Sequence, residues 1–314
     1  MSTGSKVAIL FALLLAACFI SLTTGEVKGW DPNVILHIRL PRLLLGLIVG
    51  TALATAGAVY QGLLRNPLAD PYILGTSSAG TFGALIAIIL NFHLAYTLYL
   101  FSIGFSFLSM ILVYRIATTG GRTPIQTLIL AGVISSTFFS ALVLLLFSLY
   151  RRESFSVLFF MLGSLSAGGS GWLMLAAAIL IAGGLLLSLL FARDLDAMSS
   201  GEENAHHLGI SVSRVKQILF FSSSVLVGAS VALAGSIGFV GLIIPHIIRL
   251  LAGPSHRKLI GMSAIGGAFF LVLMDVLSRT VFSPVEVPVG VFTSLCGAPF
   301  FIYLLKRRQR EVIF

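Results

Sequence analysis

The sequence predicts an all-α, polytopic membrane protein with about ten transmembrane helices. Of its 314 residues, 57% are hydrophobic and only 10% are charged, and the mean hydropathy is +1.05. A soluble chain of this length needs more polar residues than that to cover its outer surface. The apolar residues also fall into separate runs of helical length. These observations predict one transmembrane domain over residues 1–314.

Ten apolar runs have roughly the length of a helix that crosses a hydrocarbon core of about 30 Å. They cover residues 7–24, 42–63, 72–91, 94–114, 124–149, 172–191, 217–235, 237–251, 259–277 and 288–305. The eighth run is short, because at 1.5 Å per residue it would reach only about 22 Å. We therefore expect other helices, rather than lipid, to shield one side of it.

The first run and two segments between the runs need separate comment. The first run is expected to remain as a helix, since no convincing small-x-small cleavage site precedes Glu26. Residues 156–172 are apolar and then rich in Gly and Ser, which predicts a half-helix and a turn packed against protein. The longest polar loop, residues 193–216, predicts one or two short helices at the membrane surface.

The basic residues predict the orientation of the chain. Ten spans place both termini on one side, and a cytoplasmic N-terminus puts fourteen of the twenty Lys and Arg residues inside. The outer face then holds Lys28, Arg39, Arg42, Arg151, Arg152 and Arg279. The net charge of +9 therefore reflects topology and contact with anionic lipid rather than nucleic-acid binding.

Several kinds of chemistry are disfavoured by the sequence. It contains no G-x-x-x-x-G-K-[ST] motif, so nucleotide energy must come from a partner protein. Cys18 and Cys296 are far apart and lie in apolar runs, which indicates neither a disulfide framework nor a metal cluster. We expect no catalytic residue, metal or cofactor.

Small residues recur every four positions in the second span. They are Gly46, Gly50, Ala54, Ala58 and Gly62, and this spacing places them on one face of a helix. Such a face permits close approach of another backbone. It predicts packing within the bundle, with a dimer seam as the alternative.

The segment RLPRLLLGLIVGTALATAGAVYQGLLRNPLADPYILG resembles the FecCD family of ABC importer permeases, which serve iron-siderophore, haem and cobalamin uptake. The resemblance continues through GEENAHHLGI, LAGSIGFVGLIIPHIIRL, MDVLSR and EVPVGVFTSLCGAPFFIYLL, in the family's order and spacing. It implies a FecCD-type permease fold in a bacterial or archaeal cytoplasmic membrane. It also implies a homodimer with two cytoplasmic ATP-binding subunits and a periplasmic or lipid-anchored binding protein.

The resemblance gives Arg39, Arg42 and Arg279 a role in docking the binding protein, through salt bridges to acidic residues on its two lobes. These residues also depart from the positive-inside pattern. A planar guanidinium suits a carboxylate partner. The alternative is that each arginine caps a helix or extends toward lipid headgroups. For Asp275 and Glu286, which lie close to Arg279 in sequence, we expect a local ion pair.

The segment from Gly201 to Gly209 matches the family's coupling segment, which contacts the ATPase. Gly201, Glu202, Ala205, Leu208 and Gly209 fit the pattern, with Leu208 as an apolar anchor. His206 and His207 are adjacent on a short helix and so point in different directions, which favours solvent exposure over metal binding.

Other functions fit the sequence less well. An ion-coupled secondary transporter would need an acidic residue or an unwound ion site at mid-membrane, and no acidic residue lies near the middle of a predicted span. A membrane enzyme would need a catalytic constellation. Within the importer class, a smaller cargo such as an oxyanion or a metal ion is the alternative. A bare metal favours His, Cys or carboxylates along its path, and these are scarce in the spans.

Overall fold

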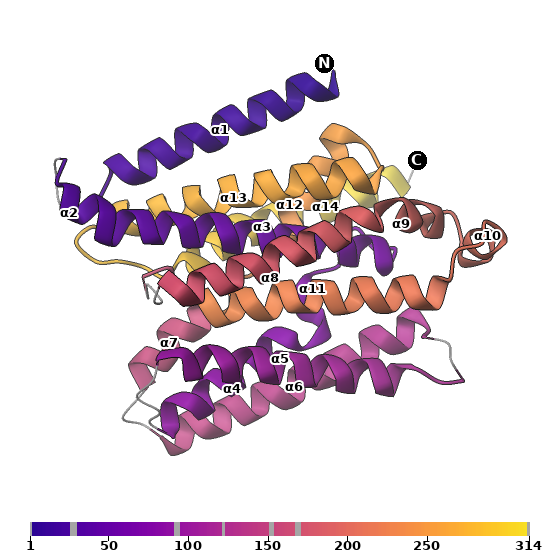
Figure 1. Cartoon of the computed structure of the whole chain (residues 1–314), viewed down its shortest axis with the longest axis horizontal. Coiled ribbons are helices and arrows are strands. Elements are labelled where there is room, and N and C mark those ends of the chain that lie inside the picture. The colour runs from indigo at the N-terminus through magenta and orange to yellow at the C-terminus, as the bar shows by residue number, and fades with distance from the viewer. Residues whose placement is uncertain are drawn as a thin grey trace.

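The computed structural model describes residues 2–25, 30–90, 95–120, 123–150, 154–166 and 171–312. Its helices run in a layered bundle, with α1 along one edge and α4, α5 and α6 along the other (Figure 1). The first half of the chain forms α1 (Thr3–Thr23), α2 (Pro32–Val34), the π-helix η1 (Ile35–Arg39), α3 (Leu40–Leu63), the 3-10 helix η2 (Pro71–Leu74), α4 (Thr76–Ile89), α5 (Ala95–Ala117) and α6 (Ile125–Leu149). The second half forms α7 (Ser154–Leu162), α8 (Gly171–Leu190), α9 (Ala192–Ser199), α10 (Glu202–His207), α11 (Val212–Ala234), α12 (Val240–Ala252), α13 (His256–Thr280) and α14 (Val289–Val312).

Each of the ten predicted spans coincides with a helix. Seven helical segments in the described chain are long and apolar enough to cross a membrane, and three apolar helices are shorter. The chain is therefore a multi-pass membrane protein. The expected half-helix is α7, and the polar loop forms α9 and α10 as two short helices.

The third predicted span, residues 72–91, begins too early. Asp70 instead starts η2 by accepting a hydrogen bond from Tyr72 N at 2.7 Å, and Gly75 ends it at φ +78°. This left-handed backbone suits glycine and reorients the chain before α4 begins at Thr76. With 14 residues, α4 is too short to span the hydrocarbon core alone.

Helices α3, α11 and α13 form the centre of the bundle. Between 72% and 78% of the apolar window of each is buried, against 11% for α1. The short helix α12 packs on α3 and α13 and buries Val240, Leu242 and Ile244, which agrees with the expected shielding of the eighth span.

Pro245 interrupts the hydrogen-bond ladder of α12, and Gln61 of α3 compensates for it. Proline has no N–H, so the carbonyl of Gly241, four residues earlier, loses its helical partner. The buried Gln61 Nε2 lies 3.5 Å from Gly241 O and donates to Leu242 O at 3.1 Å. A neighbouring side chain thus satisfies backbone oxygens inside the bundle.

We expect Gln61→Leu to destabilise the protein by about 1–3 kcal/mol, because it leaves the buried carbonyl of Gly241 without a donor. Thermal unfolding in detergent measures the effect. Gln61→Glu is a useful companion, since it keeps the shape of the side chain but replaces the donor group. Wild-type stability of the leucine variant would contradict the assigned role.

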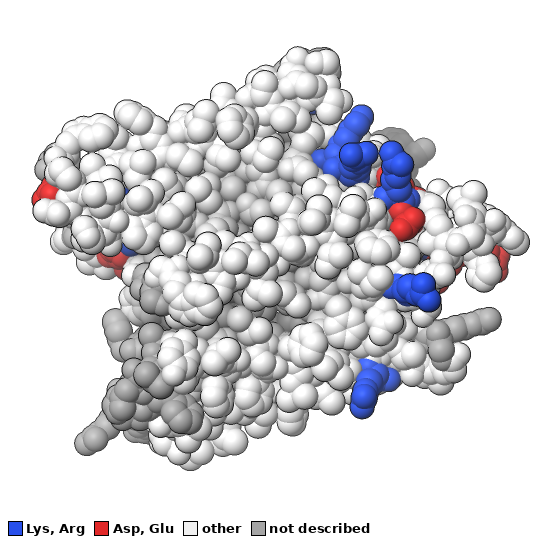
Figure 2. All heavy atoms as spheres, viewed as in Figure 1, with Lys and Arg blue, Asp and Glu red and all other residues white. Residues whose placement is uncertain are grey.

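The two ends of the bundle differ in charge. Most exposed Lys and Arg side chains in Figure 2 gather at one end, where Figure 1 shows α9 and α10. We call this end the basic end. Lys6, in the first turn of α1, lies there, since its Nζ donates to Leu251 O at 2.6 Å near the end of α12. Lys28, Arg151 and Arg152, which the sequence assigned to the other side, lie outside the described residues.

Candidate functional site

The three arginines predicted to dock a binding protein lie together at the end opposite the basic end. Arg39 ends η1, Arg42 lies in the first turn of α3 and Arg279 in the last turn of α13. Their exposed fractions are only 3%, 8% and 6%. The structure therefore brings them together but buries them within the chain.

Two carboxylates, Asp275 and Glu286, form ion pairs with Arg42 and Arg279 of this cluster. Arg42 Nε lies 2.7 Å from Asp275 Oδ1, and Arg42 Nη1 lies 2.9 Å from Glu286 Oε2. Arg279 Nε lies 3.2 Å from the second oxygen of Asp275, one helical turn away. The expected local pair of Asp275 and Arg279 is present, and Arg42 joins it from 233 residues away.

Arg39 and Arg279 also satisfy the C-terminal carbonyls of α1, which have no partner within that helix. Arg39 Nη1 donates to Leu22 O at 2.7 Å, and Arg279 Nη2 donates to Ser21 O at 3.0 Å. Arg279 Nη1 donates to Thr24 O at 3.2 Å. The cluster thus joins the ends of α1, α3 and α13.

Glu286 is the accessible member of the cluster, with 43% of its side chain exposed. It lies in the loop between α13 and α14, outside the spans, and also accepts a hydrogen bond from Ser166 Oγ at 3.0 Å. Partial burial raises the pKa of Glu286, but the hydrogen bond and charge of Arg42 outweigh it, so the net pKa lies below the ordinary value. Glu286 is therefore ionised at neutral pH.

The predicted coupling segment forms α10, which projects beyond the bundle at the basic end (Figure 1). Gly201 precedes α10 with φ +130° and Gly209 follows it with φ +80°, so both occupy backbone that glycine favours. Ala205 is fully buried beneath the helix, whereas Leu208 is 72% exposed. An exposed leucine on a protruding helix is suited to a protein contact.

Glu202 anchors α10 to its neighbours. Its Oε1 accepts a hydrogen bond from Lys216 Nζ of α11 at 2.8 Å and lies 3.8 Å from Arg65 Nη2 after α3. His206 and His207 are both exposed, as expected. The described residues contain no group of three potential metal ligands.

The small-residue face of α3 packs inside the chain. A Cβ on Gly46 would lie 3.2 Å from Val272, and a Cβ on Gly50 would collide with the carbonyl oxygen of Gly267. A Cβ on Gly62 would lie 2.6 Å from His256 Nε2. Ala54 and Ala58 are fully buried in the same helix. These contacts join α3 to α13.

A recess lined by hydroxyl groups lies between α4, α6, α7 and the segment before α12. Its volume is about 270 Å³, and its polar lining consists of Ser77, Ser78, Thr81, Ser140 and Ser236. Ser77 Oγ donates to Ser236 Oγ, and Ser140 Oγ donates to Ser78 Oγ, both at 3.1 Å. Met161, Val143 and Leu144 complete the wall. The recess can offer hydrogen bonds to a ligand without any charged side chain.

The sequence did not identify these particular residues. The run G-T-S-S-A-G-T at 75–81 was a usable signal, because Ser77 and Thr81 are four residues apart and share a helical face. Ser140 and Ser236 reach the recess from distant segments, which only the packing brings together.

Comparison with known proteins decides the family. The model of the FecCD transport family matches residues 5–307. The chain belongs to the FecCD transport family. Proteins of this family are permease subunits of ABC transporters. The resemblance predicted from the sequence is therefore confirmed over nearly the whole chain.

Its relatives carry several cargo names. The cobalamin import permease BtuC of Halobacterium salinarum is 42% identical, over 87% of this chain and 73% of that protein. The hemin transport permease HmuU of Yersinia pestis is 40% identical, over 89% of this chain and 85% of that protein. The molybdate import permease MolB of Haemophilus influenzae is 38% identical, over 91% of this chain and 85% of that protein.

A solved structure also matches. An inward-facing putative metal-chelate type ABC transporter is similar with a TM-score of 0.89 and 34% identity, covering 97% of this chain and 99% of the other. The FecCD fold predicted from sequence is thereby confirmed.

Proposed function

We propose that this FecCD protein is the membrane subunit of a binding-protein-dependent importer that moves an iron chelate, haem or cobalamin inward. The family match over residues 5–307 carries the proposal. The uncharged, hydroxyl-lined recess supports it, since it can contact part of a chelate through weak hydrogen bonds. Two ATP-binding subunits, a substrate-binding protein and a second copy of the chain complete the proposed transporter, with both termini cytoplasmic.

Reconstitution into liposomes tests the cargo. The chain, its ATPase and its binding protein are combined, and uptake of ferric siderophore, hemin, cobalamin and molybdate is compared with and without ATP. ATP-dependent uptake of one chelate is the expected result. Uptake of molybdate alone would favour the smaller-cargo alternative, which the relative named for molybdate supports. Uptake driven by a proton or sodium gradient without ATP would reject the importer.

We place the ATPase contact on α10, with Leu208 as its anchor. Leu208→Asp is expected to lower the binding-protein-stimulated rate of ATP hydrolysis at least about tenfold, because it puts a charge into the centre of the proposed interface with the ATPase. The loss of binding-protein-stimulated ATP hydrolysis measures this. Leu208→Met keeps an apolar side chain and serves as the control. Normal stimulation in the aspartate variant would place the contact elsewhere.

Docking of the binding protein at Arg39, Arg42 and Arg279 remains part of the proposal. Since the guanidinium groups are engaged internally, an incoming carboxylate must approach through the position of Glu286, the exposed partner of Arg42. Glu286 then competes with the binding protein for Arg42.

Removing this competitor gives a direct test. Glu286→Gln is expected to strengthen binding of the substrate-binding protein by up to about fivefold, which corresponds to the roughly 1 kcal/mol of an exposed ion pair. Surface plasmon resonance on the nanodisc-embedded transporter measures the affinity. Unchanged or weaker binding would favour a purely structural role for the cluster.

A further inference from the structure

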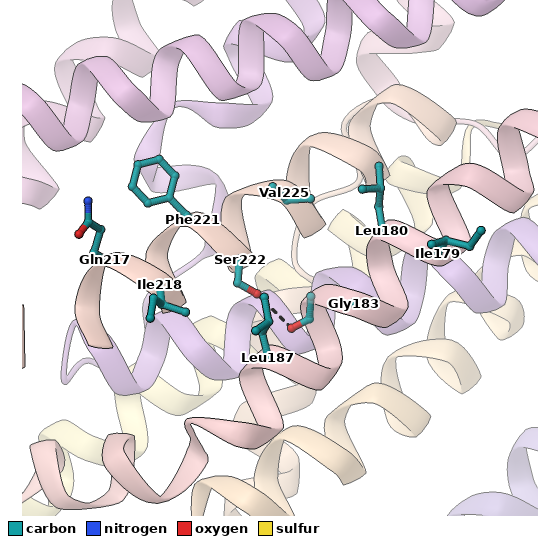
Figure 3. A pocket seen from close by; sticks show the side chains of 10 residues that line it. Ile179, Leu180, Gly183, Leu187, Gln217, Ile218, Phe221, Ser222 and Val225 are labelled. Atoms are coloured by element: carbon teal, nitrogen blue, oxygen red, sulfur yellow. Dashed lines mark hydrogen bonds between the residues drawn. The ribbon is translucent and has the colours of Figure 1, made fainter. Parts of the chain in front are cut away.

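An open apolar groove runs between α8 and α11 (Figure 3). Its volume is about 580 Å³, and Leu187, Ile218, Phe221 and Val225 form most of its wall. Gly183 opens the groove on α8, because a Cβ at that position would meet no atom within 4 Å. The next residue, Gly184, packs against Leu226 and brings the two helices together at the floor.

The polar atoms on the floor are already satisfied. Ser222 Oγ donates to the carbonyl of Gly184 at 3.0 Å, the hydrogen bond drawn in Figure 3. The hydroxyl group therefore ties α11 to α8 and offers little to a polar ligand. Apart from the amide of Gln217 at one end, what remains along the groove is hydrocarbon surface, so the groove selects an apolar occupant.

The groove opens toward the lipid. Its α8 wall belongs to the span with the highest mean hydropathy in the described chain, 2.6, of which only 22% is buried. The lining residues Ile179 and Leu180 of α8 are 64% and 43% exposed and wholly apolar. Water does not fill a hydrocarbon-lined groove at membrane depth, and an empty one would forfeit packing contacts. A flexible hydrocarbon chain is the occupant that the membrane supplies.

One charged residue continues the groove face of α11 toward the basic end. Arg214, Gln217, Ile218, Phe221 and Val225 follow one another at helical spacing, so they share a stripe along the helix. Arg214 is exposed and has no ion pair with the described residues. Lys216, by contrast, lies off this stripe and is paired with Glu202. The stripe thus joins an apolar groove to a free guanidinium group at the end of the span.

We propose that this groove is a binding site for one phospholipid of the leaflet at the basic end. An acyl chain lies between α8 and α11, and Arg214 binds the phosphate oxygens, for which the planar guanidinium fork is well suited. An apolar tail joined to a phosphate matches the apolar groove joined to an arginine. The site is independent of the cargo and of the proposed partners.

Photo-crosslinking tests the site in the intact transporter. The protein is reconstituted into vesicles of phosphatidylethanolamine and phosphatidylglycerol, with a trace of either lipid carrying a diazirine in one acyl chain. Crosslinks are expected to concentrate on residues 179–187 and 217–225. Equal labelling by the two lipids assigns recognition to the shared phosphate, whereas preference for phosphatidylglycerol assigns it to net charge; both outcomes support the site.

Two variants make the test specific. Gly183→Leu puts a side chain into the groove at a position where its Cβ meets no atom within 4 Å, and is expected to abolish the concentrated labelling, whereas Gly104→Leu, at an equally open and exposed glycine of α5, leaves it unchanged. Arg214→Gln is expected to lower lipid retention about fivefold, in line with the contribution of one basic residue at a membrane surface. Native mass spectrometry counts the retained lipids.

The opposite results would overturn the proposal. Labelling spread evenly over α1, α5, α6 and α8 would show ordinary annular lipid. Equal lipid retention in the Gly183→Leu and Gly104→Leu variants would also exclude the site. Crosslinks from the groove to a protein would assign it to a partner helix instead. Gel filtration and thermal unfolding of each variant establish that the fold is retained.

Discussion

Gly50→Ala is expected to destabilise the protein by about 1–3 kcal/mol or more, although alanine is the better helix former. The added Cβ would collide with the carbonyl oxygen of Gly267 and lie 2.7 Å from its carbonyl carbon. Both atoms belong to the backbone of α13, so no side chain can rotate away. The helices α3 and α13 would have to separate along the centre of the bundle. Thermal unfolding in detergent measures the loss.

Two comparisons sharpen this prediction. The contact is reciprocal, since a Cβ on Gly267 would collide with the carbonyl oxygen of Gly50. Gly267→Ala should therefore cost about as much, and the double variant less than the sum, because the same contact is lost once. Gly104→Ala, where the Cβ meets nothing within 4 Å, should be neutral or stabilising by up to about 1 kcal/mol. Equal effects at Gly50 and Gly104 would contradict the close approach.

The helices were predictable because their signal is local. Each apolar run became a helix, and even the short eighth span and the half-helix at α7 could be read from run length and composition. The start of α4 was missed, because η2 depends on the Asp70 cap and on Gly75 with positive φ. Hydropathy carries no information about such a turn.

The sites were predictable only in part. The pair of Asp275 and Arg279 follows from i, i+4 spacing, so the sequence indicated it. Sequence alone does not bring Arg42 beside Asp275, nor Ser77, Ser140 and Ser236 into one recess, because these contacts join segments far apart in the chain. The groove between α8 and α11 could not be predicted either, because it forms only where Gly183 of α8 lies beside Phe221 and Val225 of α11. Burial of Arg39 and Arg279 likewise depends on the carbonyls at the end of α1.

The buried carboxylate of Asp275 gives the second large effect. Asp275 is 2% exposed and lies between Arg42 and Arg279, with one oxygen toward each. Asp275→Asn leaves the two guanidinium groups facing a neutral amide inside the protein, and only Glu286 remains to balance Arg42. Removing one partner from a buried ion pair typically costs about 3–5 kcal/mol, because the remaining charge stays desolvated.

The matched control is Glu286→Gln, which removes the other carboxylate on Arg42 from an exposed position. Arg42 keeps its ion pair with Asp275 in this variant, and the lost carboxylate is 43% exposed, so the expected loss is at most about 1 kcal/mol. A large difference in melting temperature between the two variants would show that the cluster holds α1, α3 and α13 together through its buried member. Similar, small losses would mean that the arginines are only loosely tied within the chain.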